Sequence, residues 1–271
     1  MPALSRHWPL WALWLMPGLS VAGEFVPPEV QFSLQHLKEE ERPRAARALG
    51  PLEALPRYQV RLELDPTSRK VTGHERVEWT VRERPLAAVY LRVTPNAFDP
   101  RETLSEVKVN GVAIKPERPE DSLYRLPLAA PLAPGSAVVV ELDLEARAPR
   151  AQPGTSSLLG ALGASGGGSA GGDYGAFSST DDFLSLVGVV PRVPPQDAAG
   201  SPWAGPTGVG DLALYEPAHV LASILVPSGW KVHTTGVAMG EVPQPDGRVR
   251  FSFAAGAVRD FPVFASRGYE S

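Results

Sequence analysis

Few residues in this sequence combine the types and the spacing that chemistry requires. The pentapeptide His74–Glu78 (HERVE) begins like H-E-x-x-H, the helical zinc motif in which two histidines four residues apart share one face. Here the fifth residue is a glutamate, and the segment alternates with the period of a strand, so the two end residues would lie about 13 Å apart. Side chains at that separation cannot hold one metal ion, and we expect an exposed strand face instead of a zinc site.

A second chemical pattern lies in the glycine-rich segment. The residues around Ser165 and Ser169 both match G-x-S-x-G, the pattern that surrounds the nucleophile of many serine hydrolases. That function requires a buried strand turning sharply into a helix, whereas glycine tracts match the pattern by composition alone. The tract also lacks the Gly-Lys-Ser/Thr ending of a phosphate-binding loop. We therefore interpret residues 150–175 as a flexible Gly-Ser loop.

Two histidines leave an alternative open. His219 and His233 fall in separate predicted strands and could meet, with Asp211 or Glu216, in a metal or acid–base site. Isolated histidines that face solvent are the competing interpretation.

Other candidates are a pair of aspartates and three tryptophans. Asp181 and Asp182 are adjacent, so on any regular element their side chains diverge and do not favour paired acid–base catalysis. Trp79, Trp203 and Trp230 could form an aromatic binding surface, although packing in the core or anchoring a loop is the role that we expect.

Composition excludes several classes of function. The 271 residues include 26 basic and 30 acidic side chains, a formal charge of −4, which gives no basic surface for nucleic acid. Cysteine is absent, so disulfides, thiolate catalysis and Cys-ligated zinc are excluded. The 29 prolines and 26 glycines favour short strands and turns over long helices.

The N-terminal residues 1–23 have the layout of a secretory signal peptide. A weakly basic start precedes an apolar stretch, residues 8–19, and small residues follow, with a plausible cleavage after Ala22 or Gly23. The apolar stretch is shorter than the roughly 20 residues of a membrane span; a buried N-terminal helix is the alternative. We expect a secreted or periplasmic chain without a transmembrane segment in its mature form. Residues 24–56 read as a linker with one or two short helices, broken at Pro43.

From Arg57 onward the hydrophobic period becomes two, which predicts strands. In Tyr58–Leu64, apolar and polar side chains alternate, typical of a half-buried strand. In Val71–Val81, Gly73 and Glu75 share the face of Val77, so we expect only the second half of that strand to be well buried. Further strands are predicted at residues 88–94, 106–109, 112–115, 122–128, 137–146, 183–190, 218–226, 230–236, 248–254 and 258–265.

The predicted strands favour a β-sandwich or an open, saddle-like antiparallel sheet over residues 57–271. Asn110-Gly111 joins two of them, and this dipeptide is the strongest two-residue hairpin signal because both residues tolerate positive φ. Strands at this spacing with no helices between them are typical of such all-β architectures.

A series of short fragments spans about four-fifths of the sequence. The fragments are Leu55–Pro66, Val71–Gly73, Leu91–Asn96, Val109–Gly111, Pro131–Ser136, Gly210–Asp211, Val226–Trp230, Thr235–Gly236 and Val258–Phe261, followed by Ser266 and Tyr269. In these fragments and in their order the chain resembles the N-terminal domain of M1-type (gluzincin) zinc aminopeptidases.

The resemblance implies a saddle-shaped β-sandwich that packs beside a thermolysin-like catalytic domain and helps to wall the substrate cleft. The family's H-E-x-x-H motif, its distant glutamate, its G-x-M-E-N motif and its catalytic tyrosine lie beyond this domain, and the sequence ends at Ser271, where the next domain should begin. No catalytic or metal-binding residue is therefore carried over, and zinc is expected only in a catalytic domain beyond residue 271.

Some family members place a Gln or Glu of this domain against the amino group of the substrate. The corresponding stretch here, residues 179–191, contains neither, and Asp181 and Asp182 become the candidate contacts with a substrate cleft.

The sequence leaves two hypotheses about function. The chain is either a non-catalytic module of an exported M1-like metallopeptidase, whose partner is a catalytic domain and whose contact with peptide is indirect, or a stand-alone secreted β-sandwich that binds a partner or glycan.

Overall fold

The computed structural model describes residues 38–41, 43–44, 47, 52–97, 99–151, 176–197, 201–203 and 215–268. The proposed signal peptide and most of the glycine-rich segment lie outside these residues. In the linker, Pro43, Arg44 and Arg47 are helical, and the short 3-10 helix η2 covers Leu52–Ala54. Pro43 therefore lies in helical backbone, and a break of the linker at this residue stays a prediction.

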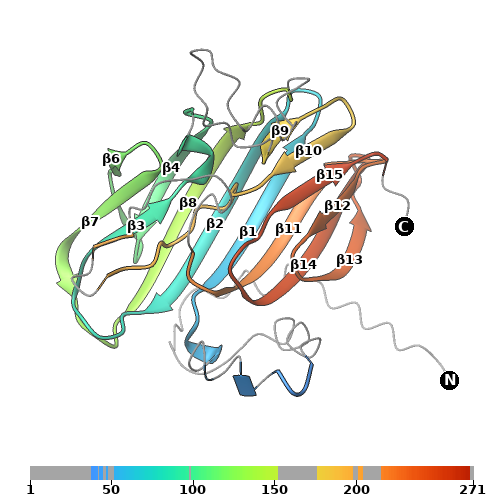
Figure 1. Cartoon of the computed structure of the whole chain (residues 1–271). Coiled ribbons are helices and arrows are strands. Elements are labelled where there is room, and N and C mark those ends of the chain that lie inside the picture. The colour runs from blue at the N-terminus through green and yellow to red at the C-terminus, as the bar shows by residue number, and fades with distance from the viewer. Residues whose placement is uncertain are drawn as a thin grey trace, which may run out of the picture.

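An eight-stranded main sheet forms the body of the molecule (Figure 1). Its strands follow the order β13 (Val237–Pro243), β14 (Arg248–Val258), β11 (Ala218–Pro227), β1 (Arg57–Asp65), β2 (Lys70–Thr80), β8 (Ala137–Arg147), β4 (Glu102–Val109) and β5 (Val112–Ala113).

The main sheet is mixed, whereas the sequence predicted an antiparallel one. β1 and β11 run parallel, with Val60 beside Ala222, and all other neighbours are antiparallel. Parallel strands need a long crossover. The chain provides one, because strands β2 to β10 all lie between β1 and β11 in the sequence.

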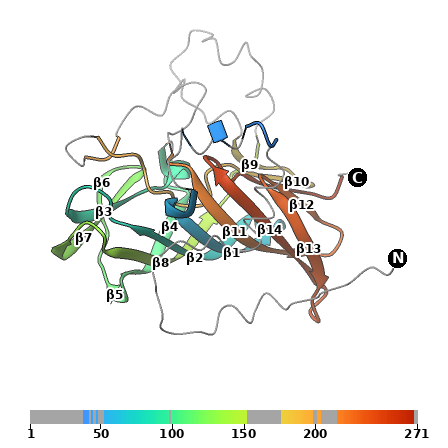
Figure 2. The same cartoon turned by 90° about the horizontal axis from the view of Figure 1, so that it is seen from below.

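Two smaller sheets lie in front of the main sheet in Figure 1, and Figure 2 shows the same layers from below. Buried residues of all three sheets belong to one hydrophobic cluster, which makes the fold a β-sandwich. One sheet has the order β12 (Lys231–Thr234), β15 (Val263–Ser266), β10 (Phe183–Leu186) and β9 (Phe177–Ser179); the other has β3 (Leu86–Arg92), β7 (Leu123–Leu132) and β6 (Glu117–Glu120).

Alternation along the strands buries one face of the main sheet and leaves the other to ion pairs. Tyr58, Val60, Leu62 and Leu64 of β1 are all buried, as predicted. The opposite face of β2 and its neighbours carries polar pairs across the strands. They are the ion pairs of Arg57 with Glu78 (2.7 Å) and Lys70 with Glu145 (2.9 Å), and the hydrogen bond between His74 and Asp143 (2.8 Å).

The predicted hairpin at Asn110-Gly111 is confirmed, since these residues join β4 to β5 with φ of 49° and 78°. The structure also contains three short strands that the sequence pattern did not predict: β6, β9 and β13. All four residues of β6 are exposed and all three of β9 are buried, so neither strand shows the alternation that a prediction depends on.

Candidate functional site

A cluster of buried ionisable side chains lies between the main sheet and the segment that follows β10. Glu75, on β2, is completely buried, with an exposed fraction of 0%. The sequence placed it correctly on the face of Val77 but predicted that this half of the strand would be poorly buried, and that prediction is wrong. Neither oxygen of its carboxyl group has a hydrogen-bond partner among the described residues.

Burial decides the protonation of this carboxyl group. Removal from water raises the pKa of Glu75 well above its ordinary value, and the nearby Arg192 guanidinium offsets only part of that increase. A raised pKa favours the neutral acid, which is cheaper to bury than a carboxylate.

Arg192 is the cation of the cluster, and its exposed fraction is only 3%. Its guanidinium carbon lies 4.3 Å from the ring centroid of Tyr58 and 5.9 Å from that of Tyr215, within cation–π range. Nη2 donates to the carbonyls of Glu216 (3.3 Å) and Val258 (3.4 Å). Nε and Nη1 have no hydrogen-bond partner among the described residues. The rings and carbonyls therefore hold the arginine without a direct salt bridge.

Two tyrosines complete the cluster. The Tyr58 hydroxyl accepts a hydrogen bond from the backbone N–H of Val193 (2.9 Å), and burial raises its pKa to about 12. Tyr215 shares a hydrogen bond with the Thr94 hydroxyl, and burial likewise raises its pKa. Arg192 and Tyr215 also line a pocket of about 20 Å³, room for a water-sized group but not for a peptide side chain.

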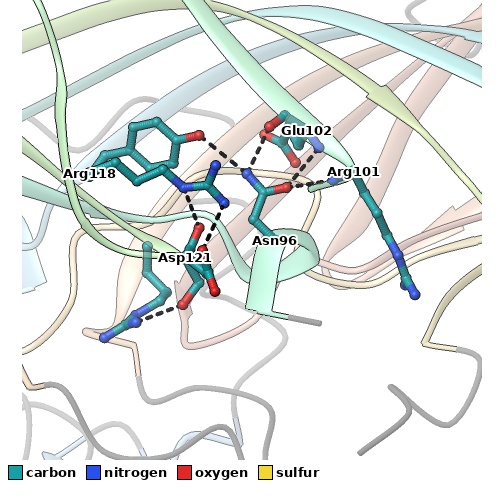
Figure 3. A network of polar contacts seen from close by, with 8 residues as sticks. Asn96, Arg101, Glu102, Arg118 and Asp121 are labelled. Atoms are coloured by element: carbon teal, nitrogen blue, oxygen red, sulfur yellow. Dashed lines mark hydrogen bonds and ion pairs between the residues drawn. The ribbon is translucent and has the colours of Figure 1, made fainter. Parts of the chain in front are cut away.

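A second buried acid, Glu102, begins β4, and Asn96 fixes its backbone (Figure 3). The Asn96 oxygen accepts from the N–H groups of Arg101 and Glu102, both at 2.8 Å. The Asn96 amide donates to the Glu102 carbonyl (2.7 Å) and to the Tyr124 hydroxyl (3.3 Å). Burial raises the pKa of Glu102 well above its ordinary value, and the Glu75 carboxylate raises it further.

The aspartates singled out from the sequence lie elsewhere, on the surface. Asp181 pairs with Arg150, and both line a polar pocket of about 180 Å³ beside Thr67 and Arg69. The Asp182 side chain is exposed, while its backbone carbonyl accepts from the N–H of Arg267 (3.1 Å). Their role as contacts with a substrate cleft stays a prediction.

The two candidate histidines lie in different sheets. His219, on β11, is buried; Nε2 donates to the Leu52 carbonyl (2.7 Å), and Nδ1 accepts from the N–H of Ala257 (3.2 Å). These bonds to backbone groups fix one neutral tautomer and give the ring a structural role. His233 is exposed on β12. Asp211 lies outside the described residues, so the alternative of a joint site with it stays untested.

The three tryptophans do not form an aromatic surface. Trp230 is buried, Trp79 packs against the core cluster, and Trp203 is 38% exposed. The carbonyl of Trp203 accepts from Nη2 of buried Arg92 (2.8 Å), which ties this residue to β3. The expected roles in packing and anchoring are therefore confirmed.

The described residues contain no group of three or more His, Cys, Asp or Glu side chains that could hold a metal ion. Within the same residues no helix has both the length and the apolar character that crossing a membrane requires. What the structure shows of the buried cluster is a set of ionisable groups whose pKa values burial raises. Arg192 and Glu102 escaped the sequence analysis because no motif surrounds them.

Comparison with solved structures shows that the chain is similar to them in fold. No protein-family model matches the chain, and a search of curated proteins finds no significant match. Among solved structures, an M1 zinc metallopeptidase from Deinococcus radiodurans is 14% identical, with a TM-score of 0.50 over 78% of this chain and 41% of that chain. A two-domain M1 zinc metallopeptidase mutant bound to L-tryptophan is also 14% identical, with a TM-score of 0.50 over 78% and 42%. The chain therefore spans less than half the length of these structures.

Proposed function

We propose that this chain is the non-catalytic N-terminal β-sandwich module of an exported M1-like zinc metallopeptidase, and that it packs beside a catalytic domain. The observation that carries the proposal is the match of 78% of the chain to about two-fifths of two-domain M1 metallopeptidases. The ordered sequence fragments, from Leu55–Pro66 to Val258–Phe261, support it independently.

In this proposal the zinc and the peptide-cleaving residues belong to the partner domain. The 271 residues contain no H-E-x-x-H, and His74 and Glu78 have separate partners on a strand face. The module would contribute a wall of the substrate cleft, with Asp181 and Asp182 as the candidate contacts. Their exposure leaves both carboxylates accessible to such a neighbour.

The charge distribution suggests which face the catalytic domain avoids. The outer face of the main sheet carries ion pairs on β1, β2 and β8, and a partner that covered them would have to remove these charges from water. We therefore expect the partner to contact the side of the smaller sheets, where β9 and β10 hold the segment of Asp181.

The test compares this chain with the longer product of its coding sequence. Reading that sequence beyond Ser271 should reveal an H-E-x-x-H motif, and the longer protein should bind one zinc and hydrolyse an aminoacyl anilide. The 271-residue chain alone should do neither. A stop codon beside an unrelated gene would instead favour the stand-alone binding module, and zinc-dependent hydrolysis by the short chain would refute both.

Export is tested separately. Expression of the whole chain, followed by N-terminal sequencing of the mature product, should find cleavage after Ala22 or Gly23. Retention of Met1 in a cytoplasmic product would contradict the export part of the proposal while leaving the domain assignment intact.

A further inference from the structure

The first half of β4 places an acid in the core and holds its backbone there. Glu102 is 2% exposed, and neither carboxyl oxygen has a hydrogen-bond partner among the described residues. Its N–H and carbonyl, by contrast, are both bonded to Asn96. The side chain can therefore reach water only if this part of the strand moves.

The charged neighbours of Glu102 do not favour its ionised form. Glu75, on β2, is the acidic group that acts on it. Arg192 lies beside Glu75, and the guanidinium of Arg101 donates to the Phe177 carbonyl (3.4 Å) and to Asp99 (3.3 Å). A charge on Glu102 would be desolvated, and ionisation of the neighbouring Glu75 would add repulsion between two carboxylates, which is the costly arrangement for buried acids.

The geometry of β4 separates this half of the strand from the other. A bulge between Ser105 and Lys108 interrupts its pairing with β8, and Glu106 within it has a φ of 50°. The edge strand β5 pairs only with Lys108 and Val109. Residues Glu102–Ser105 therefore have β8 as their one neighbouring strand in the main sheet, whereas the second half lies between two strands.

We propose that Glu102–Ser105 is a pH-dependent edge of the main sheet: ionisation of the Glu102 carboxyl releases this half-strand from β8 while Lys108 and Val109 remain paired. The released state exposes the carboxylate to water and frees the loop that Asn96 holds. This inference concerns the β-sandwich itself and does not depend on the partner domain proposed above.

Linkage between proton binding and opening determines whether the half-strand opens more or less often as pH rises. The closed state binds the Glu102 proton more tightly than the open state, in which the carboxyl is solvated. Opening should therefore become more frequent as pH rises above the ordinary glutamate value of about 4.3, by up to about tenfold per pH unit for one proton. The increase should end where pH exceeds the raised pKa of the closed state.

Hydrogen exchange on the full chain tests this proposal. Protection factors, corrected for intrinsic exchange, are measured from about pH 5 to about pH 9, a range that begins above the ordinary glutamate pKa. We expect the protection of Glu102–Ser105 to fall with pH while that of Lys108 and Val109 stays constant. Glu102→Gln should abolish the fall, and Glu106→Gln, a change at an exposed glutamate of the same strand, should not.

Glu75→Gln provides a second arm. The substitution removes the acid whose ionisation opposes that of Glu102, so the closed-state pKa of Glu102 is lower, and the total loss of protection should be smaller and should end at a lower pH. This arm decides the question if Glu102→Gln does not fold. An unchanged pH dependence in Glu102→Gln or in Glu75→Gln, or a fall that extends equally to β1 and β11, would overturn the proposal.

Discussion

At the scale of single residues, the core of this sandwich contains ionisable groups that most cores exclude. Glu75 and Arg192 are both buried and lack a direct hydrogen bond to each other, so the desolvation of each is offset only in part. The surrounding groups reduce the cost: Tyr58 covers the guanidinium, and two carbonyls accept from it. The cluster is therefore a feature that the fold tolerates, and it makes stability sensitive to protonation.

Tyr58→Phe measures what one polar contact of the cluster contributes. The substitution keeps the ring over Arg192 but leaves the N–H of Val193 without its acceptor. We expect the free energy of unfolding to fall by about 1–3 kcal/mol, the cost of a buried unsatisfied donor, measured by urea denaturation. Tyr124→Phe is the control, because its hydroxyl makes a longer bond (3.3 Å) to Asn96. Equal losses in the two variants would argue against a special role for Tyr58.

Sequence patterns identified the face of Glu75 but not its environment. The period of two correctly grouped it with Val77, whereas its charge suggested exposure. What compensates the charge in part is Arg192, which approaches from a distant segment, and no local pattern reports such a contact. The histidines illustrate the same limit, since the bonds of His219 to Leu52 and Ala257 depend on how the chain packs.

At the scale of elements, β2 is held closely by its neighbours, and Gly73 shows how closely. A Cβ at this position would lie 2.6 Å from the carbonyl oxygen of Arg61 and 2.6 Å from Leu62 Cδ2. The first contact is with backbone of β1, which cannot yield without disturbing the pairing of the two strands. The glycine is thus required by close approach.

Gly73→Ala should accordingly lower the free energy of unfolding by roughly 3 kcal/mol, the upper end of the range for overpacked cores. Gly247→Ala is the matched control: no atom lies within 4 Å of its added Cβ, but its φ of 82° is in the left-handed region. That backbone effect should cost about 1 kcal/mol. Thermal or urea unfolding of both variants measures the difference, and a Gly73→Ala protein as stable as Gly247→Ala would contradict the packing argument.

Regular alternation explains which strands the sequence could predict. β1 and β8 keep one period along most of their length and were predicted close to their observed bounds, whereas β14 has three consecutive buried residues and was predicted only to residue 254. In β4 the bulge shifts the buried positions from Glu102 to Val107 and Val109, so the pattern predicted only the second half. The parallel pairing of β1 with β11 joins distant segments, and local periodicity gives no information about it.

At the scale of the whole molecule, the charge pattern divides the surface from the core. Ion pairs cover the outer face of the main sheet, and the inner face packs against two smaller sheets around one hydrophobic cluster. The buried acids Glu75 and Glu102 lie on this inner face of the main sheet. Protonation of these acids should therefore affect the stability of the entire sandwich as well as the edge at β4.

Global stability should be greatest in mildly acidic solution. The raised pKa values of Glu75 and Glu102 mean that their contribution is fully present below the ordinary glutamate value and is lost as pH rises through their folded values. Hydrogen bonds lower the pKa of Asp65 and Asp246, so their contribution to stability, weakened by exposure to solvent, is present above the ordinary aspartate pKa and is lost as pH falls.

Urea denaturation across a range of pH measures this balance, and the midpoints should be highest at about pH 4–5. The double variant Glu75→Gln/Glu102→Gln should flatten the alkaline side and leave the acidic side unchanged, and a wild-type midpoint that instead rises from pH 5 to neutrality would show that these carboxyl groups ionise without cost in the folded chain.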